Sequence, residues 1–466
     1  MFSWQIYEIY EILLTLRAMV LKRVRILTKV VAIIMMAAAY ACTPVDFDFE
    51  YRPEPGREND FSRAPVKPYK DVFIIYSMGF NDLNSYLRSD IREILSSPLM
   101  TNQRDVLLIL SHLSEGYEFS KQTSPSLTRI TRDINGDIVR DTLKKMPAGS
   151  VITNADTLRS VLDYVKKEFE AERYGILFSS HGTGWVPEGY VSDPEKFDPQ
   201  DDDELIPILA RPRQKRALYN IGREEDEPAV KSLGAHCISQ YESIEMNIND
   251  MAAAFPYKMD YMIFDACFMG CIETAYEFRN VTEKMVVSQT ESLAEGMDYE
   301  TMTSYIFTPS GPDLEGFCKN HYDFYNSKSG IYKSATISLI DCSRLEPLAQ
   351  SAKHIFSTYR SGLNTLQTTR NVQQYFRNRY RSTQQWFYDF GDIVYKCGLS
   401  EADLDEFNRR LNDAVIYKGA TEVFMNDFRI TCHSGLSMYL PITYRRDYLN
   451  TFYKTLEWNK ATGLVQ

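Results

Sequence analysis

The sequence predicts an α/β fold with a largely parallel sheet, and three features support this prediction. Short apolar segments alternate with longer amphipathic ones over residues 70–345, which is the pattern of strands joined by crossover helices. Two of the apolar segments are followed by reactive side chains, which in parallel sheets collect at the carboxyl ends of the strands. The chain has 466 residues, 44% of them hydrophobic, which suffices for two or three ordinary domains or one large domain with an appendage.

Six segments are expected to form strands, because each is apolar and rich in β-branched or aromatic residues. They are 71–76, 106–110, 174–178, 261–264, 285–287 and 335–340. Helices are expected between them, over 154–172 and 272–278. In the first of these helices, apolar residues recur at helical spacing opposite charged ones. These residues are Leu158, Val161, Leu162 and Val165.

Two parts of the chain interrupt this alternation. Residues 187–233 are highly charged, with runs such as DDDEL, RPRQKR and REEDE, and keep neither a helical nor a strand period. They are predicted to form a mobile loop inserted in the core. Between 346 and 427 the pattern becomes helical, and an apolar segment follows at 434–441. Residues 346–466 are therefore predicted to form a helical C-terminal subdomain with one returning strand.

The N-terminal residues are typical of an export signal followed by a tether. Basic residues within 22–29 precede the apolar run 30–39, which is too short to span a bilayer comfortably. The run ends in small residues and Cys42, a pattern that resembles a lipoprotein signal with a lipidated cysteine; a cut after Ala41 without a lipid is the alternative. Both interpretations predict export by residues 1–42. The first predicts a membrane-anchored lipoprotein of the cell envelope, on its periplasmic or surface face, with the proline-rich residues 43–69 as tether.

The composition argues against several classes of protein. A net charge of −11 and a pI near 5.3 argue against nucleic acid as the main partner, because phosphate binding needs a basic face. The eight cysteines form no CxxC pair and the six histidines are dispersed, so no metal site is predicted. No cofactor is expected. Weak calcium binding by the acidic run 201–203 stays open, although no EF-hand loop occurs.

Two strand ends carry the residues of thiol catalysis. The segment 174–178 leads to His181-Gly182, and 261–264 leads to Asp265-Ala266-Cys267. If these strands are neighbours, an imidazole and a thiol meet at one sheet edge, which is the minimum for a thiolate nucleophile with a general base. Cys267 is also expected to begin a helix, whose dipole favours the thiolate. The N–H groups of Gly182 and Cys267 are candidates for stabilising the oxyanion of a tetrahedral intermediate.

These strand ends resemble the two signature blocks of clostripain-type cysteine peptidases, relatives of caspases, legumains and gingipains. The blocks are HGTGW at 181–185 and DACFMG at 265–270. Other segments resemble further blocks of the family in the same order. They are Asn81-Asp82-Leu83, Glu273, SQTESLAEGMDY at 288–299, DFGD at 389–392 and GLSMYLP at 435–441. The resemblance covers about residues 70–445 and implies a caspase-like three-layer α/β/α fold.

The resemblance also implies an endopeptidase with named site residues. His181 and Cys267 form the implied catalytic dyad, and Gly182 contributes to the implied oxyanion hole. Asp265 is implied to line the S1 pocket and to select a basic P1 residue, since a carboxylate in a narrow cleft pairs far better with Lys or Arg than with a neutral side chain. Candidates for a second acid in this pocket are Asp298 and, less strongly, Glu291 and Glu295. The preference between Arg and Lys stays open.

The charged insert carries sites at which such an enzyme is expected to cut itself. Members of the family are commonly activated by a cut between the histidine and cysteine halves. Basic residues of the insert that are candidate P1 sites are Lys196, Arg211, Arg213, Lys215, Arg216 and Arg223. Self-cleavage near Arg213, Lys215 and Arg216 is predicted to open the cleft.

Three alternatives compete with this interpretation. A lone cysteine after a strand is most often a small core residue, but the Asp-Ala prefix and the His-Gly of another strand favour catalysis here. A catalytically inactive surface lipoprotein that binds peptide or glycan is expected to have lost part of the dyad, and both members are present. A metallohydrolase needs clustered Asp, Glu and His, and the histidines of this sequence do not cluster.

Overall fold

The computed structural model describes residues 68–97, 104–116, 119–132, 137–191, 197, 236–239, 242–377, 386–441 and 447–466. All of them belong to one compact unit, Tyr51–Gln466. The predicted export signal, nearly all of the predicted tether and most of the charged insert lie outside the described residues. Among the helices that are described, none is long and apolar enough to cross a membrane.

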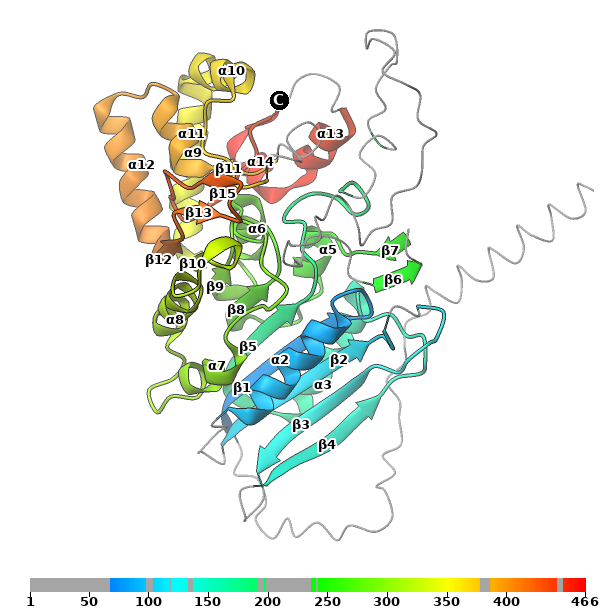
Figure 1. The fold of residues 1–466 in the computed structure, drawn as a ribbon. Helices are drawn as coiled ribbons and strands as arrows, with labels where there is room; N and C mark the ends of the chain where they lie inside the picture. Colours follow the sequence, from blue (N-terminus) through cyan, green and yellow to red (C-terminus); the bar gives the residue numbers. More distant parts are fainter. Residues whose placement is uncertain are drawn as a thin grey trace, which may run out of the picture. The chain divides into compact units, whose positions relative to one another are not determined.

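A sheet of nine strands forms the centre of the described unit (Figure 1). Its order is β12-β10-β9-β8-β5-β1-β2-β3-β4. The strands are β1 (Tyr69–Gly79), β2 (Asp105–Leu113), β3 (Ser126–Arg132), β4 (Ile138–Lys145), β5 (Ala171–Ser179), β8 (Met259–Asp265), β9 (Thr282–Val287), β10 (Thr336–Asp341) and β12 (Val415–Ala420). All six segments predicted as strands lie in this sheet.

The central strands are parallel, as the sequence predicts. β1 pairs in parallel with β2 and β5, β5 with β8, and β8 with β9. Both outer parts of the sheet are antiparallel, because β3 and β4 extend β2, and β10 and β12 extend β9. The sequence does not predict β3, β4 or β12. Charged and polar side chains interrupt their apolar pattern, and β4 and most of β12 are half-buried or exposed.

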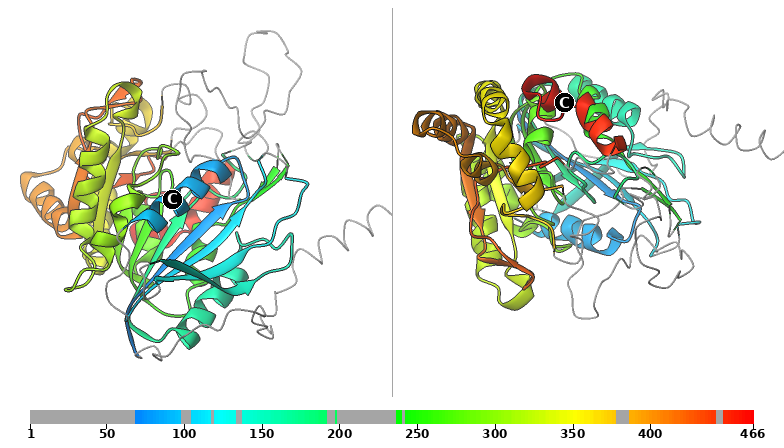
Figure 2. Two further views of the ribbon diagram at one scale, coloured as in Figure 1. Left: turned by 60° about the horizontal axis from the view of Figure 1, so that its bottom comes forward. Right: turned by 90° about the horizontal axis from the view of Figure 1, so that it is seen from above.

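Helices cover both faces of the sheet, so the predicted three-layer arrangement is confirmed. On one face lie α2 (Asn84–Ser96), α7 (Tyr299–Ile306) and α8 (Leu314–Asn326); on the other lie α3 (Ala155–Glu168), α5 (Ile248–Ala253) and α6 (Ile272–Phe278). Figure 2 (right) shows α2 and α3 on opposite sides of the strands. The core joins Ile94 of α2 and Met302 of α7 to Ile263 of β8. Across the sheet, the ring of Phe264 packs against Phe278 of α6.

The C-terminal part is helical, as predicted, but it also adds a strand to the sheet. Helices α9 (Leu345–Thr358), α10 (Arg360–Thr369), α11 (Phe390–Lys396) and α12 (Glu401–Ala414) precede β12. Since β12 pairs with β10 at the sheet edge, residues 346–466 are continuous with the core sheet. The returning strand predicted over 434–441 is only β15 (Ser437–Met438), which pairs with β11 (Tyr388–Asp389).

Short elements complete the described chain. They are β6 (His236–Ser239), β7 (Glu242–Ile244), η2 (Gly330–Tyr332), η3 (Cys342–Arg344), β13 (Val423–Phe424), β14 (Phe428–Arg429), α13 (Asp447–Thr455) and α14 (Glu457–Thr462). The buried ring of Trp458 in α14 packs edge-on against Tyr276 of α6 and Phe390 of α11. The end of the chain therefore belongs to the core.

The register of three central strands places residues near their carboxyl ends in one row. Ser77 of β1 pairs with Ser179 of β5, and Ser179 pairs with Asp265 of β8. Because neighbouring parallel strands end at the same sheet edge, the loops that follow these residues meet there. The loops with His181 and Cys267, for which the sequence predicts thiol catalysis, both follow strands that end at this edge.

Candidate active site

The loops that carry His181 and Cys267 leave adjacent parallel strands at the same register. Across the strand ends, the N–H of Ser180 donates to the carbonyl oxygen of Asp265 at 3.4 Å. Gly182 lies so close to the second loop that a Cβ at this position would fall 2.6 Å from the carbonyl oxygen of Cys267 and 3.1 Å from its nitrogen. Glycine permits this approach because it has no Cβ. The structure thus brings the backbones of Gly182 and Cys267 into contact.

The imidazole of His181 lies against a carboxylate. Its Nε2 is 2.7 Å from Oδ1 of Asp82, and 4% of the His181 side chain is exposed, against 24% for Asp82. Asp82 follows β1, so a third strand end of the same edge contributes to the site. The sequence places Asp82 in a family block without giving it a role. Its position after a third parallel strand is the signal that could have identified it.

The sulfur of Cys267 is held by the backbone of another loop. The N–H of Ser292 donates to Sγ at 2.9 Å, and Oγ of Ser292 donates to the carbonyl oxygen of Ala266 at 3.3 Å. A hydrogen bond donated to sulfur stabilises the thiolate more than the thiol. Cys267 is buried in this structure.

The prediction that Cys267 begins a helix is wrong. α6 begins at Ile272 with Cys271 as its N-cap residue, and a turn separates this helix from β8. In that turn Phe268 has a φ of 59°, in the left-handed region that bulky residues rarely adopt, and its ring stacks on Phe387 with centroids 4.6 Å apart. A helix dipole acts mainly within the first turn. The α6 dipole therefore contributes little at Cys267, and nearby N–H groups such as that of Ser292 are the ones that can stabilise a thiolate there.

Asp265 is buried two positions before Cys267, with 1% of its surface exposed. Its Oδ2 accepts hydrogen bonds from the Tyr299 hydroxyl at 2.7 Å and from Oγ of Ser179 at 3.2 Å. Burial raises the pKa of Tyr299 well above its usual range, and the nearby carboxylates of Asp265 and Asp90 raise this pKa further. The phenol therefore stays a donor to Asp265.

The three other acids that the sequence names for this pocket have contacts of their own. Asp298 is the N-cap residue of α7, and its carboxylate accepts hydrogen bonds from Oγ1 of Thr301 at 2.6 Å and from Asn320 at 3.0 Å. Glu291 forms a buried bidentate ion pair with Arg377, at 2.6 and 2.9 Å. Glu295 pairs with Lys328. A role in the S1 pocket stays a prediction for each of them.

Two buried groups near the turn between β8 and α6 have structural contacts. Glu273 of α6 accepts hydrogen bonds from the N–H of Tyr439 at 2.8 Å and from the hydroxyl of Tyr453 at 2.6 Å, and burial raises its pKa to about 7. Sγ of Cys271 is 3.0 Å from Oγ1 of Thr274, and burial raises the pKa of this thiol. A thiol whose pKa is raised is a poor nucleophile at neutral pH.

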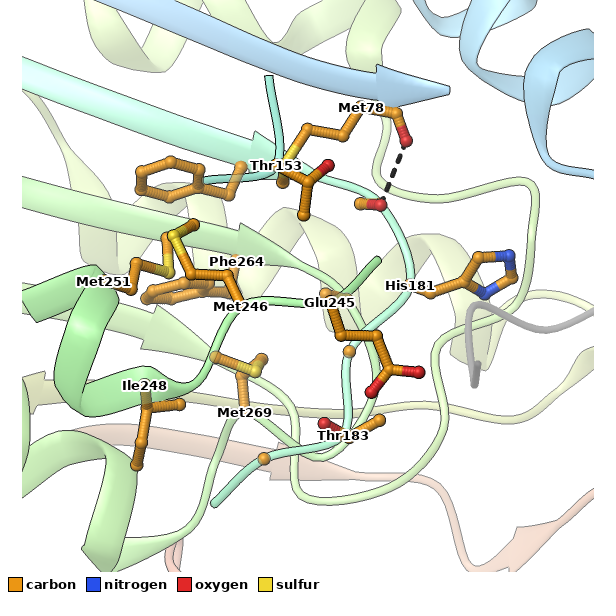
Figure 3. A pocket seen from close by; sticks show the side chains of 15 residues that line it. Met78, Thr153, His181, Thr183, Glu245, Met246, Ile248, Met251, Phe264 and Met269 are labelled. Atoms are coloured by element: carbon orange, nitrogen blue, oxygen red, sulfur yellow. Dashed lines mark hydrogen bonds between the residues drawn. The ribbon is translucent and has the colours of Figure 1, made fainter. Parts of the chain in front are cut away.

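A small cavity of about 70 Å³ lies beside the His181 loop (Figure 3). Phe178 of β5 lines this cavity, and side chains alternate between the faces of a sheet along a strand, so the cavity lies on the face opposite to Ser179 and Asp265. Most of its walls are apolar, and four methionines contribute to them: Met78, Met246, Met251 and Met269. Figure 3 shows the His181 ring pointing away from these methionines. This cavity is therefore separate from the pocket that the sequence predicts at Asp265.

Within the described part of the chain, no three His, Cys, Asp or Glu side chains gather so as to hold a metal ion. The acidic run 201–203, named above for calcium, lies outside that part. That the protein needs no cofactor stays a prediction, and weak calcium binding by residues 201–203 stays open.

The chain is similar to known proteins over most of its length. The sequence profile of the clostripain family matches residues 75–209 and 222–463, whereas no curated protein sequence matches the chain. An inactive zymogen of a C11 protease from Parabacteroides distasonis superposes with a TM-score of 0.64 at 25% identity, covering 85% of this chain and 98% of its own. Iotapain, a secreted C11 cysteine protease from Bacteroides thetaiotaomicron, superposes with a TM-score of 0.65 at 25% identity, covering 85% and 99%. A secreted C11 cysteine protease from the same organism, bound to an irreversible peptide inhibitor, shares the fold at 19% identity with a TM-score of 0.63, covering 84% and 99%.

Proposed function

Because the chain belongs to the clostripain family and is a cysteine peptidase, we propose that Cys267 is its nucleophile, that His181 is its general base, and that it cuts after basic residues. The contact between the backbones of Gly182 and Cys267, at the ends of the paired strands β5 and β8, carries this proposal. It joins the loop with the imidazole to the loop with the thiol on one edge of a rigid sheet.

In the proposed reaction, His181 takes the proton of the Cys267 thiol, and the thiolate attacks the carbonyl carbon of the scissile bond. The N–H groups of Gly182 and Cys267 are the candidates to bind the oxyanion that forms. The imidazolium then gives its proton to the departing amine, and a water molecule hydrolyses the thioester with His181 again as base. Nε2 of His181 faces Asp82, and Nδ1 is the nitrogen proposed for these proton transfers.

Asp265 is proposed to select a basic P1 side chain. Its carboxylate is buried two positions before Cys267, so a long cationic side chain on the acyl side of the scissile bond can extend down to it. An uncompensated carboxylate is costly in a buried pocket, and a cation offsets that cost far better than a neutral side chain.

Export and lipid anchoring belong to the same proposal. Residues 1–42 carry the pattern of an export signal that ends at Cys42, although they lie outside the described residues. The similar protein iotapain is described as secreted. The proposed partners are therefore protein or peptide substrates outside the inner membrane. The lipid on Cys42 would anchor the protein in a membrane of the cell envelope, and nucleic acid is not a proposed partner.

A panel of fluorogenic peptides that differ only at P1 tests the specificity. We expect kcat/KM for Arg and Lys at P1 to exceed that for norleucine or glutamate by about 100-fold or more, because a buried site built for a charged group discriminates strongly against analogues that lack it. Equal rates across the panel, or faster cleavage after the neutral residue, argue against a basic S1 pocket.

Self-cleavage in the insert is proposed as the step that exposes the sulfur. The burial of Cys267 supports it, as does the cluster Arg213, Lys215 and Arg216, which lies outside the described residues. We expect purified wild-type protein to be cut in this cluster, as seen by intact-mass spectrometry. The matched control is Cys267→Ala protein, which is expected to stay intact under the same conditions. Cleavage of that variant at the wild-type rate excludes self-processing, since it has no nucleophile.

A further inference from the structure

The loop after β9, residues 288–292, lies along the turn that carries the proposed nucleophile. Its Ser292 N–H is 2.9 Å from Sγ of Cys267, and Oγ of Ser292 donates to the carbonyl oxygen of Ala266 at 3.3 Å. In the opposite direction, the N–H of Phe268 donates to the carbonyl oxygen of Thr290 at 3.0 Å. The position of this loop therefore decides where a hydrogen-bond donor meets the sulfur.

The first part of the loop is anchored by β10. The N–H groups of Gln289 and Thr290 both donate to Oγ1 of Thr336, at 3.0 and 3.1 Å. Thr336 is buried in the sheet, with 1% of its surface exposed. This anchor ends at Thr290, two positions before the N–H that reaches the sulfur.

Arg377 anchors the second part of the loop. Its Nε and Nη2 donate to the two carboxylate oxygens of Glu291 at 2.6 and 2.9 Å, and both residues are buried. Oγ1 of Thr290 donates to the carbonyl oxygen of Glu291 at 3.0 Å. Because a peptide group is planar, contacts that hold the carbonyl and the side chain of Glu291 also restrict the direction of the Ser292 N–H.

The part of the chain that supplies Arg377 also contacts the turn itself. The N–H of Tyr375 donates to the carbonyl oxygen of Phe387 at 3.0 Å, and the Phe387 ring stacks on Phe268 with centroids 4.6 Å apart. The C-terminal subdomain therefore contacts both the loop that donates to the sulfur and the turn that carries the sulfur.

We propose that Arg377 is a positioning residue of the peptidase, which holds the Ser292 N–H on the sulfur of Cys267 through its ion pair with Glu291. This inference rests on the proposed function, because that function names Cys267 as the nucleophile, and it adds a residue of the C-terminal subdomain to the site. Arg377 acts through the loop and not on the reacting atoms.

The chemistry of the pair suits positioning better than stability. A buried ion pair often stabilises a fold no more than two apolar side chains of similar size, whereas a bidentate guanidinium–carboxylate pair fixes orientation as well as distance. An N–H directed at sulfur stabilises the thiolate more than the thiol. A tilt of the peptide group between Glu291 and Ser292 is therefore expected to raise the pH at which the thiolate forms.

Arg377→Gln in the full chain tests the proposal. The rate of alkylation of Cys267 by iodoacetamide is measured against pH, by mass spectrometry of the peptide that contains this residue, because the thiolate reacts and the thiol does not. We expect the midpoint of the pH dependence to rise by about one pH unit, the effect of about one hydrogen bond. Alkylation below both midpoints is then expected to be about 10-fold slower than in the wild type, and alkylation above both midpoints nearly unchanged.

Arg173→Gln is the matched control, because Arg173 forms an ion pair of the same geometry far from the site. Its Nε and Nη2 donate to the two oxygens of the buried carboxylate of Asp71, also at 2.6 and 2.9 Å. Arg173 is the third residue of β5, near the end of the strand that is opposite to the His181 loop. The control is expected to lower the melting temperature but to keep the wild-type midpoint.

A double variant covers the case in which Arg377→Gln does not fold. Arg377→Met with Glu291→Met replaces the pair by two apolar side chains, a change that folds commonly tolerate, and it removes both hydrogen bonds. The same rise of the midpoint is expected. A midpoint equal to that of the wild type in either folded variant overturns the role of Arg377, as does a wild-type Cys267 that iodoacetamide does not alkylate at any pH.

This measurement separates the inference from the proposed function, because iodoacetamide carries no peptide and no P1 side chain. A wild type that cuts no peptide overturns the proposed function itself. A wild type that cuts peptides after basic residues, with an unchanged midpoint in Arg377→Gln, overturns only the positioning by Arg377.

Discussion

Replacing Cys267 by alanine is expected to lower kcat/KM toward peptides with a basic P1 residue by about 10⁵-fold or more, as the loss of a catalytic nucleophile does. Without the sulfur no thioester forms, and the N–H of Ser292 loses its acceptor. The contact between Gly182 and Cys267 involves backbone only, so the fold is expected to persist. Initial rates with fluorogenic peptides and a thermal melt on the same sample separate the two effects.

Cys271→Ala is the matched control, because it removes the same atom four positions further along the chain. Cys271 is fully buried, and burial raises the pKa of its thiol. We expect this variant to keep activity and to be labelled by an arginyl chloromethyl ketone, as the wild type is, whereas Cys267→Ala is not labelled. Labelling of the Cys267→Ala protein at another cysteine shows that a different thiol is the nucleophile.

The parallel centre of the sheet could be predicted because its strands are buried on both faces. β1, β2, β5 and β8 are almost continuous apolar runs, and such runs are typical of strands covered by helices on both sides. The outer strands β4 and β12 carry charged side chains and are largely exposed or half-buried. Their pairing depends on register with neighbours, which composition does not reveal.

For the proposed catalytic residues, the sequence predicts that they follow strands, but it does not predict the local backbone geometry. The sequence places His181 and Cys267 after strands, and β5 and β8 are indeed neighbours. It does not reveal the turn between β8 and α6, because the positive φ of Phe268 is stabilised by long-range packing on Phe387. The helix expected at Cys267 was therefore misplaced by local reasoning.

Two acidic residues also show that local sequence does not reveal which groups a side chain contacts in the fold. Asp298 lies in the segment 288–299, which resembles a pocket wall of the family, yet in space its carboxylate caps a helix. Asp90 looks like an ordinary polar residue of an amphipathic helix. Only the packing of α2 on the sheet buries it beside Ser179 and Tyr299.

Asp82→Asn is expected to lower kcat by about 10²- to 10⁴-fold while KM changes little, the effect of removing the carboxylate that orients a catalytic histidine. The carboxylate of Asp82 lies 2.7 Å from Nε2 of His181; a carboxylate at this place favours the tautomer with the proton on Nε2, in which Nδ1 carries the lone pair of the base. An asparagine can present either its oxygen or its NH₂ group there, and so loses this control.

Two further variants decide whether Asp82 acts through His181 or only through stability. Asp82→Glu keeps the carboxylate and is expected to recover part of kcat. Asp313→Asn also removes a carboxylate that accepts a backbone N–H, that of Gly316 at the start of α8, and is expected to change the melting temperature but not kcat. If Asp82→Asn cleaves as fast as the wild type, or if Asp82→Glu is no better than Asp82→Asn, the imidazole does not depend on this carboxylate. If Asp82→Asn lowers kcat at unchanged KM and Asp82→Glu restores part of kcat, Asp82 positions the base. A general loss of stability would instead lower the amount of active enzyme in both variants.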